Sequence, residues 1–319
     1  MSLQTVMVTG ANRGIGLELV RQLLAEPNPP QHLIATTRAK ANRAELDALA
    51  VKHPNLHVID MESKDYNSFT AYTPTGVVAQ VQQIVGSSGL DTLINNAGVL
   101  IPKLLDTVTA NDMIENFEIN TVSPLMLTKA LLPLLKIASV HRKTAVVNIS
   151  SSLGSIELAK PRPNGQWFSI FPYRCSKAAL NMISQCLSTD LKRDNIYVIS
   201  MNPGHLKTDL GGPTAQIEVA DGVNELAKPI PDDQWFSVYA YRCSKAALNM
   251  ISQCLSTDLK RDNIYAISMN PGHLKTDLGG PTAQIEVSDG VNGVIKQIKL
   301  IDDNSNGKLV TYAGGVLPW

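Results

Sequence analysis

The chain has 319 residues, enough for one large domain or two ordinary domains with a well-buried core. Its 28 basic and 28 acidic residues give a formal net charge of zero, which argues against nucleic acid or an anionic membrane as a partner. Hydrophobic residues make up 44% of the sequence, the proportion typical of soluble globular proteins.

The start of the chain contains no charged region followed by a long apolar one, so we predict no signal peptide. The longest apolar stretches look too short or too interrupted to cross a bilayer. The four cysteines, Cys175, Cys186, Cys243 and Cys254, come two from each copy of an internal repeat and do not suggest a disulfide framework. These features predict a cytoplasmic protein with reduced thiols.

The first unit of the chain has the pattern of a dinucleotide site. Residues 5–9 are apolar and β-branched, as in a buried strand, and the amphipathic residues 17–25 predict a helix. A glycine-rich turn between a strand and a helix lets phosphates approach backbone N–H groups at the positive end of the helix dipole. The glycine spacing differs from the common GxGxxG, so a plain turn stays an alternative. The turn residues expected at the cofactor are Gly10, Asn12, Arg13, Gly14, Ile15 and Gly16.

The second predicted strand, His32–Thr37, ends at Arg38. An acidic residue at this place would accept hydrogen bonds from the ribose hydroxyls of NAD, and the sequence has none. Arg38 and Arg13 instead suit the 2′-phosphate of NADP, although either arginine taken alone is more often an ordinary solvated side chain.

Three further elements follow in chain order. Residues 56–59 predict a third strand that ends at Asp60. At this place Asp60 could recognise the amino group of the adenine ring. Val77–Val85 predicts a helix, and residues 90–94 predict a fourth strand. The segment that closes this strand consists of Asn95, Asn96, Ala97 and Gly98.

A long helix is predicted from Thr109, as its N-cap, to Leu135. Pro124 has no N–H, so the carbonyl of Asn120 loses its helical donor and the helix should kink there. Either this is a bare kink, or the freed carbonyl binds a water beside an active site. Thr144–Ile149 is the fifth predicted strand, and Ser151 follows it.

A Tyr-Arg-Cys-Ser-Lys string occurs twice, at residues 173–177 and 241–245. Residues four apart share one face of a helix. The phenol can donate a proton, and a neighbouring ammonium should lower the pKa of the phenol by favouring phenolate. A string of this kind is by itself most often a solvated helix face, so the argument depends on its context.

These motifs together carry a family resemblance. The glycine turn, the Asn-Asn-Ala-Gly segment, the helix asparagine, the serine followed by x-x-Gly, the YxxxK pair and a Pro-Gly after the sixth strand stand in one order along nearly the whole chain. In this set and order the chain resembles the short-chain dehydrogenases/reductases. Within that family it is most similar to the sniffer-type carbonyl reductases and the C-factor (C-signal) group, on the longer string Tyr-Arg-Cys-Ser-Lys-Ala-Ala-Leu-Asn and the closing Gly-Val-Leu-Pro-Trp.

The resemblance implies an α/β fold, a doubly wound (Rossmann), mostly parallel sheet in a single domain over residues 1–319. Seven strands are expected, the last near residues 308–312. The implied reaction is NADPH-dependent reduction of a small-molecule carbonyl (ketone, aldehyde or quinone) to an alcohol. A catalytically silent NADP-binding protein or a signalling protein of the C-factor type is the alternative. No metal is predicted, and a homodimer is left open.

The resemblance also implies roles for single residues. Tyr173 or Tyr241 would protonate the substrate oxygen, and Lys177 or Lys245 would lower the tyrosine pKa and bind the nicotinamide ribose. Ser151 would hydrogen-bond the carbonyl oxygen, and Asn120 would hold a water of a proton relay. Beside the glycine turn, the cofactor residues would be Arg38, Asp60, Asn96, Ala97, Gly98, Pro203, Gly204, Pro271 and Gly272.

Residues 157–224 and 225–292 are tandem copies of 68 residues that differ at eight positions. Removal of one copy leaves 251 residues, the ordinary size of the family. Each copy carries the YxxxK helix, the next strand (Ile196–Met201 or residues 264–269) and the start of the substrate loop. A doubly wound sheet has one place for this helix and strand, so one copy should be extruded as an insertion.

Two insertion points lie in loops that tolerate extra residues. Extrusion of about residues 157–224 would make Tyr241 and Lys245 the working pair. Extrusion of about residues 212–279 would make Tyr173 and Lys177 the working pair. We favour the second arrangement, because it keeps Tyr173 22 residues after Ser151 and uses a flexible glycine-rich entry. The helix of the surplus copy has an apolar stripe that should invite domain swapping or aggregation.

Overall fold

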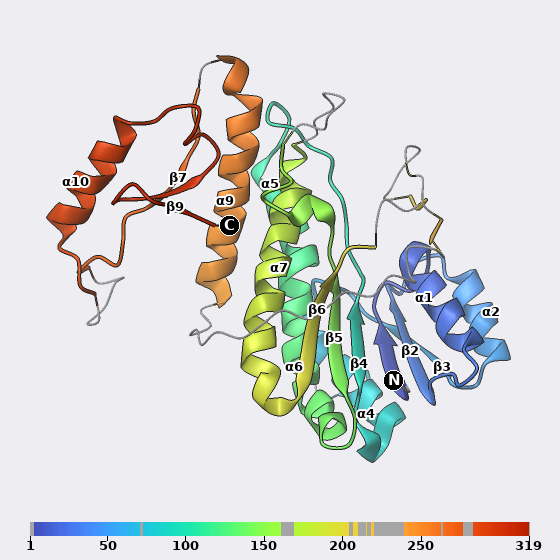
Figure 1. The fold of residues 1–319 in the computed structure, drawn as a ribbon. Helices are drawn as coiled ribbons and strands as arrows, with labels where there is room; N and C mark the ends of the chain where they lie inside the picture. Colours follow the sequence, from blue (N-terminus) through green and yellow to red (C-terminus); the bar gives the residue numbers. More distant parts are fainter. Residues whose placement is uncertain are drawn as a thin grey trace.

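The computed structural model describes residues 3–70, 73–160, 169–203, 207–209, 215, 218–219, 239–262, 264–276 and 283–318, with the side chains of 239–241 excepted. Within these residues the chain forms a six-stranded sheet covered by helices on both faces and, at its C-terminal end, a three-stranded sheet (Figure 1). The predicted doubly wound α/β fold is therefore confirmed.

All six strands of the main sheet are parallel, in the order β3-β2-β1-β4-β5-β6. Val6 of β1 lies opposite Leu33 of β2 on one side and Thr92 of β4 on the other. The strand order reverses at this point, and ligands bind at such a switch point in open α/β sheets. The strands are β1 (Thr5–Val8), β2 (His32–Thr37), β3 (Leu56–Asp60), β4 (Thr92–Asn95), β5 (Thr144–Ile149) and β6 (Ile196–Met201).

The helices form one layer on each face of the main sheet. The first layer consists of α1 (Gly14–Ala25) and α2 (Ala44–Lys52). The second layer consists of α3 (Tyr66–Thr70), α4 (Val77–Val85), α5 (Ala110–Phe117), α6 (Ser123–Ser139) and α7 (Phe171–Leu191). Short 3₁₀ turns lie at Gly86–Ser88, Ser152–Gly154, Lys192–Asp194 and Lys260–Asp262.

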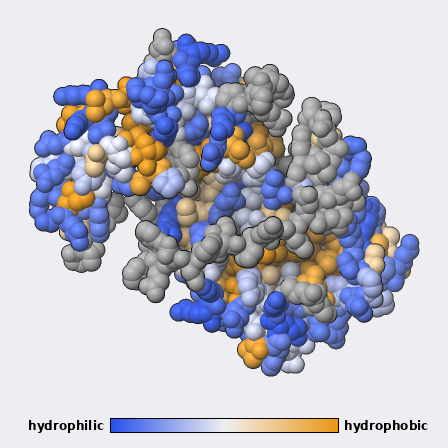
Figure 2. Space-filling model, viewed as in Figure 1, coloured by the Kyte–Doolittle hydropathy of each residue, from blue (hydrophilic) through white to orange (hydrophobic). Residues whose placement is uncertain are grey.

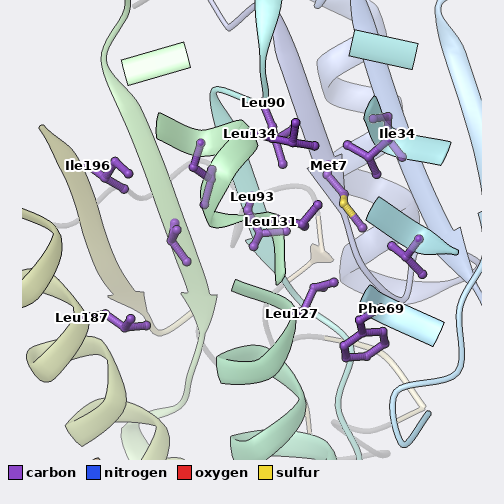
Figure 3. Close-up of a cluster of buried hydrophobic side chains, with 14 of the residues drawn as sticks. Met7, Ile34, Phe69, Leu90, Leu93, Leu127, Leu131, Leu134, Leu187 and Ile196 are labelled. Atoms are coloured by element: carbon purple, nitrogen blue, oxygen red, sulfur yellow. The ribbon is translucent and has the colours of Figure 1, made fainter. Parts of the chain in front are cut away.

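Each layer buries its own apolar cluster against the sheet. In the larger cluster, Met7, Ile34 and Leu93 of the strands meet Leu127 and Leu131 of α6, and all five are at most 1% exposed (Figure 3). A parallel sheet covered on both faces explains why its strands read as continuous apolar runs rather than as alternating ones.

The predicted long helix begins at Thr109, whose side chain forms a capping box with Asp112. The predicted break at Asn120 takes the form of a π-helical turn, Glu118–Val122, between α5 and α6. Pro124 stands in the first turn of α6, where a missing N–H is tolerated. A π-turn inside a helix often marks a functional site.

Together these elements make one helix of 30 residues, Ala110–Ser139, long and apolar enough to cross a membrane by length and composition. This helix differs from the expectation that the apolar stretches are too short or too interrupted to cross a bilayer, because the π-helical turn keeps α5 and α6 continuous. Of the most apolar window, 56% is buried inside the protein, since the helix covers the main sheet.

The two repeat copies occupy different places. In the first copy, α7 covers the main sheet and β6 pairs with β5. In the second copy, α9 (Tyr239–Asp258) lies alongside α7 and leads into a C-terminal module (Figure 1). This module consists of β7 (Ser268–Asn270), α10 (Val287–Ile298), β8 (Leu309–Thr311) and β9 (Val316–Leu317).

The seventh strand expected in the main sheet is not found there. β8 instead pairs in parallel with β7, with Met269 opposite Val310. The residues of β7, Ser-Met-Asn, are the same as residues 200–202 at the end of β6, so β8 finds the same partner sequence in the second copy. The second copy is also nearer along the chain, and a shorter connecting loop lowers the entropic cost of the pairing.

The module has a less complete core than the main sheet. Val291, Ile295 and Ile298 form one stripe of α10 and are about half exposed (45%, 45% and 54%). Figure 2 shows apolar residues among hydrophilic ones on the surface of the module. Part of the apolar stripe of α9 is nevertheless buried, since Met250 and Cys254 are 0% exposed.

Candidate active site

The glycine turn lies at the switch point between β1 and β4. Gly10 has a φ of +65°, and a Cβ built on it would lie 2.9 Å from the Cα of Ala97, so only glycine fits this close approach. The side-chain amide of Asn96 donates to the carbonyls of Thr9 (2.8 Å) and Gly10 (3.2 Å). The Thr9 hydroxyl accepts the N–H groups of Asn96 and Ala97, both at 3.0 Å. Asn96 thus holds the shape of the turn, and Thr9 is a supporting residue that the sequence analysis missed.

A cleft of about 770 Å³ opens beside this turn. Its charged lining is mainly basic: Arg13, Arg21, Arg38, Lys40 and Lys207 stand against Glu18 and Glu45. Asn12, Gly14 and Leu17 complete the wall on the side of α1. A site with this charge suits an anionic ligand such as a phosphorylated dinucleotide. Lys40 and Lys207 were not predicted, although Lys40 stands only two residues after Arg38.

Several predicted cofactor residues have protein partners in this structure. Asp60 accepts a hydrogen bond from Arg43 at 2.6 Å, so its carboxylate is ion-paired at the end of β3. Arg13 pairs with Asp209, which belongs to the loop after β6. Asn12 donates from its side chain to the carbonyl of residue 42 (3.2 Å). Ile15 and Gly16 lie in the first turn of α1.

Asn120 joins three parts of the candidate site. Its side-chain oxygen accepts the N–H of Val99 (2.9 Å), and its amide donates to the carbonyl of Val99 (2.8 Å) and the hydroxyl of Ser176 (3.0 Å). A Cβ on Gly98 would lie 3.1 Å from the same Asn120 oxygen. The fully buried Asn120 thus links the loop after β4 to α7, and Ser176 is a second supporting residue that the sequence analysis missed.

Asn120→Ala is expected to destabilise the protein by about 2–4 kcal/mol, because it removes three hydrogen bonds and leaves buried partners unsatisfied. Asn116→Ala is the matched control, since Asn116 is equally buried but makes one long bond to the carbonyl of Asp112 (3.4 Å). Urea unfolding monitored by circular dichroism measures both changes. Equal losses in the two variants would contradict the proposed linking role of Asn120.

The loop after β5 and the first turns of α7 bring three predicted catalytic residues together. Gly154 allows the approach, because a Cβ on it would lie 2.8 Å from the backbone of Lys177. The hydroxyl of Ser151 forms a hydrogen bond with Tyr173. The ammonium of Lys177 donates to the carbonyl of Ile149 (2.7 Å) and lies 5.7 Å from the centre of the Tyr173 ring. Tyr173 and Lys177 are buried, with 6% and 5% exposed.

Burial governs the protonation of this pair. It raises the pKa of Tyr173 to about 12, and the hydrogen bond to Ser151 lowers that pKa by less. Burial also lowers the pKa of Lys177 to about 8. In the cofactor-free protein the loss of water therefore outweighs the hydrogen bond to Ser151, and a lowering of the tyrosine pKa by Lys177 stays a prediction.

The equivalent residues of the second copy have different surroundings. Lys245 is exposed on α9, whereas Lys177 is buried in α7. The side chain of Tyr241 lies outside the described residues. Pro203 follows the end of β6 and Gly204 lies outside the described residues, whereas Pro271 and Gly272 belong to the C-terminal module, beyond α9 from the main sheet (Figure 1). A Cβ on Gly272 would lie 2.6 Å from Ile285, so this glycine packs inside the module.

Comparison with known proteins places this geometry in a family. The family model for short chain dehydrogenases matches residues 4–218 and 231–286, which is most of the chain. The C-signal of Myxococcus xanthus is 38% identical over 142 residues, covering 44% of this chain and 80% of its own length.

Solved structures of carbonyl reductases are similar over the whole chain. The NADPH-bound carbonyl reductase from chicken fatty liver is 32% identical, with a TM-score of 0.62 and coverage of 100% of both chains. The carbonyl reductase Sniffer of D. melanogaster is 27% identical, with a TM-score of 0.56 and coverage of 99% of this chain and 100% of its own. The chain therefore belongs to the short-chain dehydrogenase family.

Proposed function

We propose that the protein reduces the carbonyl group of a small molecule to an alcohol with NADPH, and that the first repeat copy supplies the catalytic residues. The observation that carries this proposal is the buried Tyr173, hydrogen-bonded to Ser151 and one helical turn from Lys177, at the carboxyl end of β5. In this proposal the second copy is an insertion into one NADP-binding unit. The similarity to two carbonyl reductases supports the reaction class.

The basic cleft beside the glycine turn is the proposed cofactor site. Gly10 lets the turn pack closely against Ala97, and a pyrophosphate would bind at the start of α1, where N–H groups point outward. Arg13 and Arg38 would bind the 2′-phosphate, with Lys40 adding positive charge to the same wall. NADPH, when bound, supplies the hydride that reduces the carbonyl carbon.

The residues of the chain would manage the proton. Ser151 would donate a hydrogen bond to the substrate carbonyl oxygen and so stabilise negative charge that develops there. Tyr173 would transfer the proton of its phenol to the same oxygen. Its raised pKa keeps this proton in place until negative charge builds up on the substrate. Lys177 would hold positive charge beside the tyrosine as the phenolate forms, and Asn120 would keep α7 in register with the loop after β4.

The direct test is oxidation of NADPH, followed at 340 nm, against a panel of ketones, aldehydes and quinones. Turnover that consumes one carbonyl per NADPH is expected with at least one class of substrate. Tight binding of NADPH without turnover of any panel member would contradict the proposed reaction.

Arg38→Asp is expected to weaken NADPH binding by about 10- to 100-fold, because one charge-assisted phosphate contact is replaced by a repulsive one. The same variant should bind NADH about as well as the wild type, since NADH carries no 2′-phosphate. Paired dissociation constants from isothermal titration measure this change in preference.

Arg193→Asp, on an exposed position of a 3₁₀ turn, is the control for the change in net charge. It should alter neither dissociation constant. An Arg38→Asp variant that keeps its preference for NADPH would show that other residues select the cofactor.

The similarity to the C-signal favours a second candidate, a signalling protein in which NADP binding matters and turnover does not. The two candidates differ in their need for the phenolic proton. Signalling that persists in Tyr173→Phe and is lost in Arg38→Asp would favour this second function. A cytoplasmic location stays a prediction from the sequence.

A further inference from the structure

Helix α9 of the second copy contacts the segment that joins Ser151 to Tyr173. In the part of this segment that the structure describes, the side-chain amide of Gln253, on α9, donates to the backbone carbonyl of Ala159 (3.0 Å). Ala159 is 0% exposed, so water does not reach its carbonyl and cannot replace this donor. A hydrogen bond from the second copy therefore holds the segment that follows Ser151.

A dry apolar cluster surrounds this hydrogen bond. The cluster includes two side chains of α9 and two of the segment, Met250, Cys254, Ala159 and Phe171. All four are at most 4% exposed. The partly buried Ile156 packs against the same cluster. α9 therefore covers the segment both soon after Ser151 and at the start of α7.

The residue before α7 has a strained backbone. Ile170 has a φ of +26°, in the left-handed region that a β-branched residue rarely adopts. Such a conformation persists only where the surroundings fix it. On one side of it, the carbonyl of Ser169 accepts the thiol of Cys254 (3.9 Å), and on the other side Phe171 packs in the cluster. α9 thus fixes the backbone immediately before the turn that carries Tyr173.

The repeat shows that the contact of Gln253 comes from the place of α9 and not from its local sequence. Gln185 is its counterpart in α7. In each helix the backbone carbonyl of the glutamine accepts the hydroxyls of the next serine and threonine, at 2.8 and 3.1 Å in α7 and at 2.8 and 3.3 Å in α9. Gln185 is exposed, however, whereas Gln253 is half-buried against the segment.

The C-terminal module holds the side chain of Gln253 from its other end. A Cβ built on Gly307 would lie 2.7 Å from the side-chain oxygen of Gln253, so the backbone of the module packs directly on this group. The side chain is thus fixed between the module and Ala159. A long side chain that is already fixed by packing loses little further entropy when it forms its hydrogen bond.

We propose that Gln253 is a positioning residue of the active site: it anchors the segment between Ser151 and Tyr173 to α9. The catalytic consequence rests on the proposed function, whereas the anchoring can be measured without cofactor or substrate. Ser151 and Tyr173 must act on one substrate oxygen, and a small displacement of either group costs rate. In this arrangement the first copy supplies the catalytic groups and the second copy holds them in place.

Gln253→Met tests the anchoring, because it keeps the length of the side chain and removes the donor. Hydrogen–deuterium exchange followed by mass spectrometry measures the opening of residues 153–160, where the N–H groups of Ser155 and Ala159 are hydrogen-bonded. These amides should exchange about 5- to 50-fold faster than in the wild type, since a buried carbonyl is left without its donor. Gln185→Met is the matched control and should leave their exchange unchanged.

The kinetic consequence separates positioning from a general loss of stability. In Gln253→Met, kcat/KM for carbonyl reduction should fall about 3- to 10-fold. The dissociation constant for NADPH should stay within about two-fold of the wild type, since the described residues that line the basic cleft come from elements other than α9. A general loss of stability would instead speed exchange throughout the chain.

Equal exchange of residues 153–160 in Gln253→Met and Gln185→Met would overturn the anchoring. Faster exchange confined to this segment, together with an unchanged kcat/KM, would overturn the positioning role. A wild type that turns over no carbonyl substrate would instead contradict the proposed function, and the exchange rates would still decide whether Gln253 anchors the segment.

Discussion

Tyr173→Phe is expected to lower kcat/KM for carbonyl reduction by about 10²- to 10⁴-fold, because it removes the proposed proton donor along with the hydrogen bond to Ser151. The ring stays buried, so packing and stability should change little. The duplicated chain supplies an internal control, since Tyr241 is followed by the same residues as Tyr173. Tyr241→Phe should leave kcat/KM within about two-fold of the wild type if the first copy alone is catalytic.

Steady-state rates of both variants, measured with the same carbonyl substrate and saturating NADPH, decide between the copies. The opposite result, loss in Tyr241→Phe alone, would mean that the second copy occupies the main sheet in solution. Partial losses in both variants would mean that either copy can dock, which their near-identity makes physically reasonable. The hydrogen bond between Ser151 and Tyr173 favours a loss of activity in Tyr173→Phe alone.

Much of the main sheet could be predicted, because its strands are buried on both faces and its helices carry strong local signals. The observed bounds of β5 and α4 are those predicted from the apolar runs and the helical pattern. The N-cap at Thr109 and the break at Asn120 were predicted from single residues whose chemistry leaves few alternatives, a capping hydroxyl and a proline that cannot donate.

The place of the C-terminal strand could not be predicted in the same way. β8 has two partner segments of identical sequence, at residues 200–202 and 268–270, so no local pattern can choose between them. The choice depends on chain connectivity and on where α9 packs, and both are properties of the whole fold. For this reason the prediction of a seventh strand in the main sheet was wrong.

The candidate site, like the fold, could be predicted only in part from the sequence. The spacing of Ser151, Tyr173 and Lys177 was readable, and the structure brings these three together. Their protonation could not be predicted from the sequence. The direction in which the pKa of Tyr173 shifts depends on how much water is lost on burial. Supporting residues such as Thr9 and Ser176 were missed, since a hydroxyl that holds backbone or amide groups has no distinctive sequence pattern.

Lys177→Met is expected to lower kcat by about 10²-fold or more, because the phenolate of Tyr173 would form in a buried site without a neighbouring positive charge. Lys245→Met is the matched control, since it removes the same charge from the exposed position of the repeat. Its kcat should stay within about two-fold of the wild type. Equal losses in the two variants would contradict a catalytic role for Lys177 alone.

The same substitution should change the pH dependence of stability in the cofactor-free protein. The pKa of Lys177 is lowered from 10.5 to about 8 by burial, so below pH 8 both the folded and the unfolded chain carry the charge and the folded state bears its desolvation. Between these two values the folded protein releases a proton that the unfolded chain keeps, and stability rises with pH; above 10.5 both forms are neutral and the penalty is gone. From pH 7 to 9.5 the wild type should therefore gain about 2 kcal/mol of unfolding free energy relative to Lys177→Met. Urea unfolding of both proteins at the two pH values measures this difference. A constant difference would mean that water reaches the ammonium, and the lowered pKa assigned to the buried Lys177 would be wrong.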